Sequence, residues 1–247
     1  MTILTIAVLF MNKILCNIMY TNTIIHNIII HNSVKKHKYT FIMLHPMFSD
    51  STYFNDYFEY FKNNCAIANN IKFILPESPV LDIDYPNNKQ YNVKSWYNYY
   101  TCYNNLTKLD KINNNDFLLQ TQKIVSIINN EAAIIKNYKN IFIVGVSQGG
   151  TLLFNILKFL PQPLGGLFCI KSIYMYKYIN LKTNYATPMF FFSGNKDDVY
   201  NLTFQIKCSK LLETNYNIAW TIIDGLDHYE KIDDEYIFVL KYFLLNI

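Results

Sequence analysis

One serine lies between two glycines where two apolar patterns meet, and this junction constrains the fold more than any other part of the chain. Residues 141–161 read IFIVGVSQGGTLLFNILKFLP. The first four, 141–144, form a β-branched and aromatic run typical of a strand buried in a parallel sheet that is covered on both faces. After Gly150 the apolar residues recur at helical spacing until Pro161, which ends the helix. Ser147 therefore lies on a strand-to-helix turn.

Glycine is what allows such a turn to be sharp. A Cβ at residue 145 or 149 would collide where the strand and the helix approach each other. The chain has only seven glycines in 247 residues, yet Gly145, Gly149 and Gly150 all lie within three residues of Ser147. Residues 145–149 fit G-x-S-x-G, the nucleophile-elbow motif, in the strand–turn–helix context that the motif requires. The pattern predicts a nucleophilic serine, with a plain strand-to-helix turn as the alternative.

Strand and helix patterns alternate along the chain, which predicts an α/β fold with a doubly wound, mostly parallel sheet and helices on both faces. The expected strands are 24–32, 39–45, 71–75 ending at Pro76, 141–144, 189–194 and 219–225. The expected helices are 53–61, 116–136, the segment after Gly150, 201–213 and 236–245. Residues 80–112 lack periodicity, so we expect a long loop that is functional or partly disordered. The predicted organisation is one domain over 37–247 behind an extension of residues 1–36.

The extension allows several interpretations. TILTIAVLFM at 2–11 has the length of a signal-peptide core, but no lysine precedes it and no clear cleavage site follows it. It is also too short to cross a bilayer as a helix. We favour an extra strand or hairpin, and a signal or membrane anchor within residues 1–20 or a disordered extension stays open.

Composition limits the partners and the compartment. All 22 basic residues are lysine, and a net charge of +4 with one dense cluster at 35–38 argues against nucleic-acid binding. The five cysteines are widely spaced and form no C-x-x-C pair, which fits a reducing compartment rather than zinc or dithiol chemistry. A cytoplasmic location is expected, with secretion or membrane association through residues 1–20 as the alternative. Cys169 and Cys208 stand in apolar segments and are predicted to be buried thiols.

A serine hydroxyl becomes a useful nucleophile when a base removes its proton during attack. The base is usually histidine. Of the five histidines only His228 lies after residue 45, just past the last expected strand. His45 is the rival, but it precedes the serine, whereas chain order serine, acid, histidine is the usual one for this motif.

The acid is expected at the end of the strand between the serine and the histidine. Asp197 lies three residues past Gly194 and is the favoured choice, with Asp198 as the reserve. Asp224 and Asp227 are too close to His228 along the chain to be first choices. The acid would hold the imidazole in one tautomer and stabilise the imidazolium.

An oxyanion hole needs two backbone N–H groups aimed at the developing charge. Gln148, directly after the nucleophile, should supply one, and the loop HPMFSD after an earlier strand should supply the other. Pro46 has no N–H. Met47 is therefore the predicted second donor.

Taken in order, these motifs resemble the acyl-protein thioesterase, lysophospholipase and carboxylesterase family of α/β-hydrolases. The matching segments run from about residue 39 to the C-terminus: FIMLHPMFSD, IKFILPESPV, KSWYN, GVSQGG, FFSGNKDDV and DGLDH. The resemblance implies an α/β-hydrolase fold, the triad Ser147, Asp197 and His228, and the oxyanion donors Met47 and Gln148. It further implies that residues 78–102 help to form an acyl-chain groove with Trp96 near it.

The chain departs from the family pattern at several positions that lie close to these motifs. Pro46 replaces a glycine, Ser49 stands before Asp50, Asn98 replaces an aspartate, Ser193 replaces a histidine and Asp198 replaces a proline. No member of the triad is lost. Pro46 is expected to alter the oxyanion loop and Asn98 a supporting contact, with reduced or shifted activity as the consequence.

The sequence thus predicts a serine hydrolase that cleaves acyl thioesters or carboxylic esters through an acyl-enzyme, with no metal or organic cofactor. The expected substrates are S-acylated proteins, lysophospholipids or small carboxylic esters, with transient contact to a membrane surface and a monomer or weak homodimer. One alternative is a non-catalytic homologue that binds acyl chains. Another is a membrane-anchored lipase, which depends on the first 20 residues.

Overall fold

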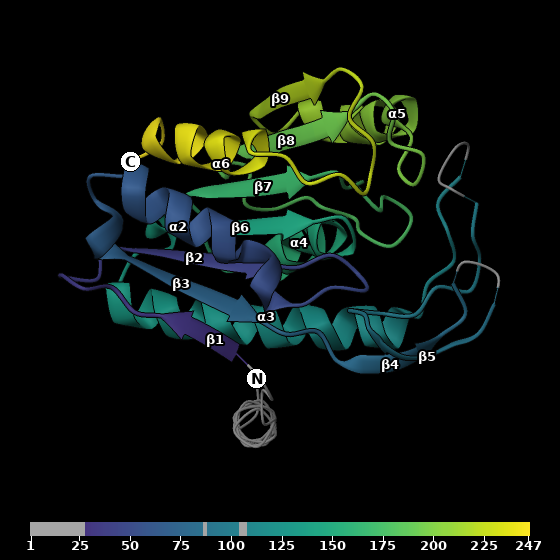
Figure 1. The fold of residues 1–247 in the computed structure, drawn as a ribbon, viewed down its shortest axis with the longest axis horizontal. Coiled ribbons are helices and arrows are strands. Elements are labelled where there is room, and N and C mark those ends of the chain that lie inside the picture. The colour runs from purple at the N-terminus through teal and green to yellow at the C-terminus, as the bar shows by residue number, and fades with distance from the viewer. Residues whose placement is uncertain (1–27, 86–87, 104–107) are drawn as a thin grey trace, which may run out of the picture.

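The computed structural model describes residues 28–85, 88–103 and 108–247 (Figure 1). Most of the predicted extension, residues 1–27, lies outside the described residues, and so do the predictions for a signal, an anchor or a hairpin there. The strand expected at 24–32 is present as β1, Ile28–His31, at the edge of the main sheet. Within the described part of the chain no helix has the length and apolar character needed to cross a membrane.

Seven strands form the main sheet, in the order β1-β3-β2-β6-β7-β8-β9. Every neighbouring pair is parallel except β1 and β3. The strands after β1 are β2 (Tyr39–Leu44), β3 (Ile71–Pro76), β6 (Ile141–Val146), β7 (Gly166–Ile170), β8 (Met189–Gly194) and β9 (Ile218–Ile223). This mostly parallel sheet confirms the predicted fold class.

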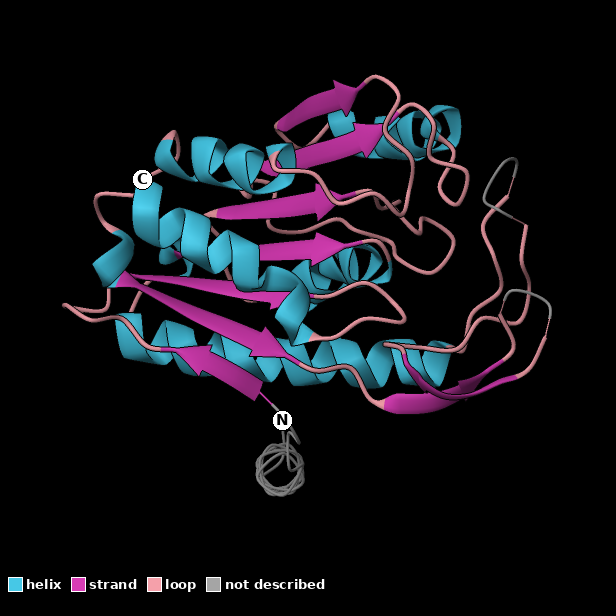
Figure 2. Cartoon of the chain, viewed as in Figure 1, coloured by secondary structure: helices cyan, strands magenta, loops and turns pink. Residues whose placement is uncertain are grey.

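Helices cover both faces of the sheet (Figure 2). The helices are α2 (Asn55–Asn64), α3 (Asn114–Ile135), α4 (Gln148–Phe159), α5 (Leu202–Glu213) and α6 (Asp234–Leu244), with 3-10 turns η1 (Ser51–Phe54), η2 (Ala68–Asn70) and η3 (Tyr138–Asn140). Helices α2 and α6 pack on one face, and α3, α4 and α5 pack on the other.

Strand β2 shows why the sequence needs both layers. All six of its residues are buried. Phe41 and Met43 point to the layer of α2 and α6, while Ile42 and Leu44 point to the layer of α3 and α4. Because side chains alternate across a strand, a continuous apolar run requires apolar cover on both sides.

Two elements differ from the sequence-based expectation. Strand β7 was not predicted, although it is a central strand of the sheet. Residues 80–112, expected to be a loop, contain β4 (Val80–Ile83) and β5 (Gln90–Lys94), which pair antiparallel as a separate small sheet. The hairpin lies beyond one end of the main sheet, near the start of α3 (Figure 1).

The strand order also determines where a site can form. The chain passes from β2 to β3 on one side and later returns to β6 on the other side of β2. Open α/β sheets bind ligands at the carboxyl ends of strands where the order reverses in this way. The loop after β2 begins at His45 and the turn after β6 carries Ser147, so both predicted parts of the oxyanion hole meet at this switch point.

The two cysteines predicted to be buried thiols are fully buried, Cys169 in β7 and Cys208 in α5. Burial raises the pKa of the Cys208 thiol to about 12, so it stays protonated near neutral pH. Both side chains act as small apolar core residues.

Candidate active site

Ser147 occupies a strained turn between β6 and α4. Its backbone has φ 51° and ψ −119°, a conformation that non-glycine residues rarely adopt. The Ser147 N–H donates to the carbonyl of Ile170 at the end of β7, at 2.9 Å. The hydrogen bond to β7 stabilises this strained conformation. The turn places the Ser147 hydroxyl at the carboxyl edge of the sheet.

Glycines make room for this turn as the sequence predicts. A Cβ on Gly145 would stand 2.6 Å from the Gly149 carbonyl oxygen, and one on Gly149 would stand 2.3 Å from the Leu44 carbonyl oxygen. These neighbours are backbone atoms, which cannot swing aside as a side chain can.

Gly149→Ala is therefore expected to lower the free energy of unfolding by about 3 kcal/mol or more, since the added methyl group must displace β2 or α4. Gly166→Ala is the matched control, because its Cβ would approach only side-chain atoms of Phe190 and Phe142, at 3.0 Å and 3.3 Å. Urea unfolding of both variants measures the difference. Equal destabilisation of the two would contradict the role of Gly149 in the elbow.

Two hydrogen bonds join the three side chains predicted to form a triad, with His228 between Ser147 and Asp197. Ser147 Oγ is 2.8 Å from His228 Nε2, and His228 Nδ1 is 2.9 Å from Asp197 Oδ2. Asp197 is 2% exposed, and Ser147 and His228 are each 9% exposed. With Nδ1–H donating to the carboxylate, Nε2 is the acceptor that faces the serine hydroxyl.

Asp197 is fixed by its own loop. Its Oδ1 accepts the backbone N–H groups of Val199 and Tyr200 at 3.0 Å and 2.7 Å, which leaves Oδ2 for the imidazole. Gln205 Nε2 also approaches Oδ2 at 3.5 Å, and Ser193 Oγ lies 2.7 Å from Gln205 Oε1. Ser193, one of the departures from the family pattern, thus holds Gln205, which in turn contacts Asp197.

The other candidate carboxylates have different surroundings. Asp198 is exposed, and the carboxylate bonded to His228 Nδ1 is that of Asp197. Asp224 accepts a hydrogen bond from Asn195 Nδ2, and Asp227 accepts the N–H groups of Tyr229 and Glu230 in its own turn. Of these four carboxylates, Asp197 is the one that is hydrogen-bonded to the His228 imidazole.

The two residues predicted to supply oxyanion donors line the same pocket as Ser147. Gln148 is the first residue of α4, where a helix leaves its N–H groups without intrahelical partners. The N–H of Phe48 is already bonded to the Lys94 carbonyl at 3.0 Å. The N–H groups of Met47 and Gln148 donate to no acceptor among the described residues, so both are available to a substrate oxygen.

Trp96 lies close to the candidate site but does not form part of the pocket wall. It is 1% exposed and does not line the pocket beside Ser147. Its Nε1–H donates to the His45 carbonyl at 2.8 Å, and its backbone N–H donates to Gln148 Oε1 at 2.8 Å. The substrate-groove role expected for Trp96 does not fit this position. It braces the loop after β2 against the start of α4.

Asn98, another departure, has a similar bracing position. Its side chain donates to Asp84 Oδ2 at 2.8 Å and accepts the Asp84 N–H at 2.9 Å. These bonds connect the small hairpin to the segment that carries Trp96. The contact is polar and partly exposed.

A network of charged side chains stabilises the loop that follows β2, residues 45–50. The Ser51 N–H donates to Glu77 Oε1 at 2.7 Å, and Lys94 Nζ binds Glu77 Oε2 at 2.9 Å and Asp50 Oδ2 at 3.2 Å. His45 is fully buried at the base of the same loop. Its Nε2 accepts the Ser78 N–H at 3.1 Å, so the ring is neutral with the proton on Nδ1, which faces the Pro46 carbonyl at 2.8 Å.

Burial lowers the pKa of His45, and the Pro46 carbonyl and the Glu77 carboxylate at 3.8 Å offset this effect only in part. An unfolded chain would protonate His45 near pH 6.5, so below that pH the unfolded state binds more protons and the fold loses stability. We expect the free energy of unfolding to fall from about pH 7.5 to about pH 5.5, and to fall less in His45→Gln. Urea unfolding at both pH values tests this. An unchanged pH dependence in His45→Gln would contradict it. Because burial also lowers the pKa of His37, His37→Gln should reduce the pH dependence too, but less, since its ring is only partly buried.

Sequence reasoning missed a second buried network behind the histidine loop. Lys171 Nζ lies 2.7 Å from Glu235 Oε1 and donates to the Glu230 carbonyl, two residues past His228. Glu235 Oε2 accepts the hydroxyls of Tyr53 and Tyr57 at 3.0 Å and 2.8 Å. The network ties the histidine loop to the end of β7. No motif marks it, because its members lie far apart in the sequence.

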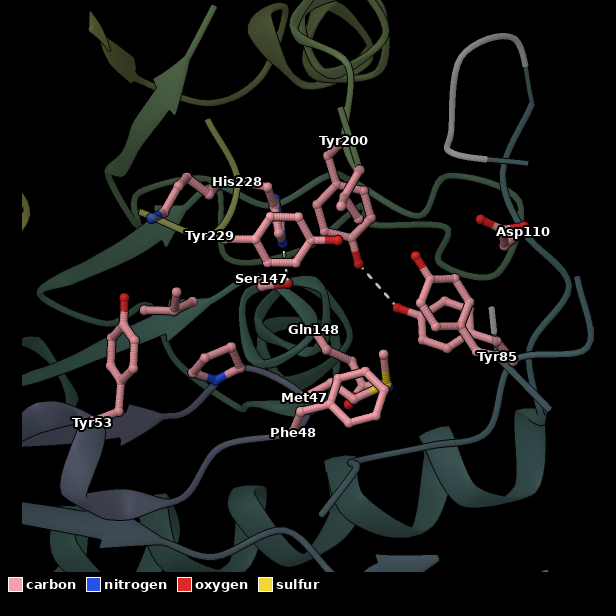
Figure 3. Close-up of a pocket in the computed structure, with 15 residues that line it drawn as sticks. Met47, Phe48, Tyr53, Tyr85, Asp110, Ser147, Gln148, Tyr200, His228 and Tyr229 are labelled. Carbon is pink, nitrogen blue, oxygen red and sulfur yellow. Dashed lines mark hydrogen bonds between the residues drawn. The ribbon is translucent and has the colours of Figure 1, made fainter. Parts of the chain in front are cut away.

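The site opens into a pocket with about 270 Å³ of free volume (Figure 3). Besides Ser147 and His228, its walls are mainly aromatic and apolar. Phe48 and Tyr229 flank the pocket and are 53% and 75% exposed, and Phe48 has a positive φ of 65°. The pocket therefore offers apolar surface next to the serine. Within the described ranges, no group of three or more His, Cys, Asp or Glu side chains is arranged to hold a metal ion.

Comparison with known proteins gives a consistent picture. Residues 26–244 match the sequence profile of a family described as phospholipase/carboxylesterase. The chain is also similar to acyl-protein thioesterase 1 of Eremothecium gossypii, with 23% identity over 215 residues that cover 82% of this chain and 87% of that protein.

Solved structures share the fold at low sequence identity. Acyl-protein thioesterase 2 of Zea mays matches with a TM-score of 0.70 and 16% identity over 89% of this chain and 98% of its own. A Bacillus cereus carboxylesterase matches with a TM-score of 0.71 and 12% identity over 94% and 99%. SOBER1 of Arabidopsis thaliana matches with a TM-score of 0.70 and 20% identity over 84% and 98%. These structures support the arrangement of strands and helices described above.

Proposed function

This chain belongs to the phospholipase/carboxylesterase family of α/β-hydrolases, and from that premise we propose that it is a serine hydrolase that cleaves acyl esters or thioesters. One observation carries the proposal. Ser147, His228 and Asp197 form a continuous hydrogen-bonded chain of 2.8 Å and 2.9 Å at the carboxyl edge of the sheet. A hydroxyl, an imidazole and a buried carboxylate in this order are the parts that activate a serine.

In the proposed reaction, Ser147 Oγ attacks the substrate carbonyl carbon while His228 Nε2 takes the hydroxyl proton. The carbonyl oxygen becomes an oxyanion, which the N–H groups of Met47 and Gln148 stabilise. The bond to the leaving alcohol or thiol breaks, and His228 gives that group its proton. The product of this half-reaction is an acyl ester on Ser147.

Water completes the cycle by the same steps. His228 takes a proton from water, the resulting hydroxide adds to the acyl carbon, and the bond to Ser147 Oγ breaks as His228 returns the proton to it. The carboxylic acid leaves and the free serine is restored. Asp197 keeps Nδ1 protonated and stabilises the imidazolium in both halves.

The pocket supports acyl substrates, because apolar and aromatic walls next to the nucleophile favour burial of hydrocarbon. Within this class we propose S-acylated proteins, lysophospholipids and small carboxylic esters. The named relatives include acyl-protein thioesterases and a carboxylesterase, which is consistent with both thioester and oxyester substrates.

The test is a panel of matched esters and thioesters, in which butanoyl, octanoyl and hexadecanoyl groups are each joined to the same alcohol and to its thiol analogue. We expect saturable hydrolysis of at least one acyl length by the purified full chain. Saturable binding of acyl compounds without any turnover across the panel would instead favour a non-catalytic acyl-binding protein.

A further inference from the structure

Three tyrosines and one threonine form a buried chain of hydroxyl groups that begins in the pocket wall. Tyr200 Oη is 2.9 Å from Tyr99 Oη, Tyr99 Oη is 3.0 Å from Tyr97 Oη, and Tyr97 Oη is 2.6 Å from Thr151 Oγ1. Thr151 Oγ1 is in turn 2.7 Å from the Gln148 carbonyl oxygen. All four side chains are at most 4% exposed. Only Tyr99 and Tyr200 line the pocket, so the chain runs from the pocket toward α4.

The carbonyl at the inner end fixes the direction of every bond. A carbonyl oxygen can only accept, so Thr151 must donate to Gln148. The Thr151 oxygen then accepts from Tyr97, because each hydroxyl has a single proton. By the same reasoning Tyr97 accepts from Tyr99, and Tyr99 accepts from Tyr200.

The outer end is left with a defined chemistry. The proton of Tyr200 is directed to Tyr99, while its oxygen retains lone pairs, and no other described donor is bonded to it. Figure 3 shows the Tyr200 hydroxyl inside the pocket, pointing toward the side that Tyr85 occupies. Toward a bound substrate Tyr200 therefore acts as an acceptor and not as a donor.

Tyr200 is well placed to contact a reacting molecule. Its ring lies edge-on to the His228 ring, with 5.3 Å between centroids, and its backbone N–H holds Asp197. Lys171 Nζ, a cationic group of the same pocket, already donates to Glu230 and Glu235. The fixed acceptor at Tyr200 thus lies next to His228 in a pocket whose walls are mainly aromatic and apolar.

We propose that Tyr200 is a specificity-determining residue that selects acyl substrates carrying a hydrogen-bond donor, a hydroxyl or an N–H group, near the scissile carbonyl. This inference rests on the proposed hydrolase activity and deepens it. The donor can belong to the acyl group or to the leaving group, and the two arms of the test separate these sources.

The experiment compares hydroxyl compounds with their methyl ethers, which keep an acceptor and lose the donor. The acyl arm uses 3-hydroxybutanoyl and 3-methoxybutanoyl thioesters of one thiol. The leaving-group arm uses 2-hydroxyethyl and 2-methoxyethyl esters of one acid. In at least one arm the wild type should favour the hydroxyl compound in kcat/KM by about fivefold or more, the effect of one good hydrogen bond.

Two variants distinguish recognition of the substrate by Tyr200 from a purely structural role of this residue. Tyr200→Phe keeps the ring and removes the acceptor, so the ratio of the two kcat/KM values should fall to about one. Tyr99→Phe removes the acceptor of the Tyr200 proton, so the Tyr200 hydroxyl can then donate into the pocket. The kcat/KM of the methoxy compound should therefore rise relative to that of the hydroxyl compound. If Tyr200 had a purely structural role, its substitution would lower kcat/KM for both compounds by the same factor and leave their ratio unchanged. Tyr100→Phe, at an exposed tyrosine that adjoins Tyr99 in sequence and does not line the pocket, is the matched control and should keep the wild-type ratio.

The outcomes separate the two claims. Wild-type hydrolysis with ratios near one in both arms, or a ratio that Tyr200→Phe leaves intact, overturns the inference while the hydrolase proposal stands. Absence of wild-type hydrolysis for all four compounds and for the matched acyl panel overturns the hydrolase proposal, and the inference with it.

Discussion

Replacing Ser147 with alanine is expected to lower kcat on any substrate of this protein by roughly 10⁵-fold or more, because the variant has no hydroxyl to form the acyl-enzyme. His228 and Asp197 would remain hydrogen-bonded to each other at 2.9 Å, but they would have no nucleophile to activate. The residual rate would come from the oxyanion donors and from substrate binding alone. Steady-state assays on the best substrate of the acyl panel measure the change.

The control for this variant is its fold. Gly145, Gly149 and the neighbouring strands hold the turn, so Ser147→Ala should unfold cooperatively with a melting temperature close to that of the wild type. Substrate binding should also persist, since the pocket walls are unchanged. A folded Ser147→Ala protein that retains more than about a hundredth of the wild-type kcat would contradict the proposed mechanism.

Asp197→Asn should lower kcat by about 10⁴-fold, which corresponds to roughly 5.5 kcal/mol in the activation free energy. An amide can donate to Nδ1 and so favours the tautomer that protonates Nε2, which then cannot accept the Ser147 proton. The amide also lacks the charge that stabilises an imidazolium. The expected loss therefore falls on kcat, and the pocket that binds substrate stays as it is.

Asp198→Asn provides the matched control for this change. The two residues are adjacent, but Asp198 is exposed whereas Asp197 is 2% exposed and bonded to His228. We expect Asp198→Asn to change kcat by less than about threefold, as is usual for an exposed charge away from the reacting groups. A larger loss in Asp198→Asn than in Asp197→Asn would reverse the assignment of the acid.

The parts of the fold that the sequence predicted are those with strong periodicity or a required turn. The run at β6, the helical spacing in α4 and the long apolar stripe of α3 all describe local patterns that the structure reproduces. Strand β7 was missed because GLFCI is a short apolar run behind Pro163 and Gly165, and periodicity does not separate such a run from a loop. The β4–β5 hairpin was missed because Val80, Asp82 and Tyr91 are partly or fully exposed, so the strands lack a clear apolar face.

In the candidate site, too, some residues could be predicted from the sequence and others could not. Chain order and the small number of histidines were enough to select Ser147, Asp197 and His228, which the structure brings together. Trp96 shows the limit of this reasoning, because a motif next to a site does not reveal whether a side chain faces the pocket or the core. The Lys171–Glu235 pair and the tyrosine chain join residues that lie 64 and 101 positions apart, and nothing local in the sequence marks such contacts.

Pro46 illustrates how a departure from the family pattern can be accommodated. Proline removes one N–H from the oxyanion loop, but its carbonyl accepts from His45 Nδ1 at 2.8 Å. Trp96 Nε1–H donates to the carbonyl of the preceding residue, His45, at 2.8 Å. The loop is therefore fixed from both sides, and the Met47 N–H stays available without glycine at residue 46.

The central claim is that Ser147 is an activated nucleophile, and labelling with a fluorophosphonate probe tests it most directly. The probe forms a covalent bond to a serine only when a neighbouring base removes the hydroxyl proton, as His228 is placed to do. We expect one equivalent of label on the peptide that contains Ser147, identified by mass spectrometry, and none in His228→Ala or Ser147→Ala. An unlabelled wild-type protein under conditions that fully label an unrelated serine esterase, or label found on another residue, would contradict the claim.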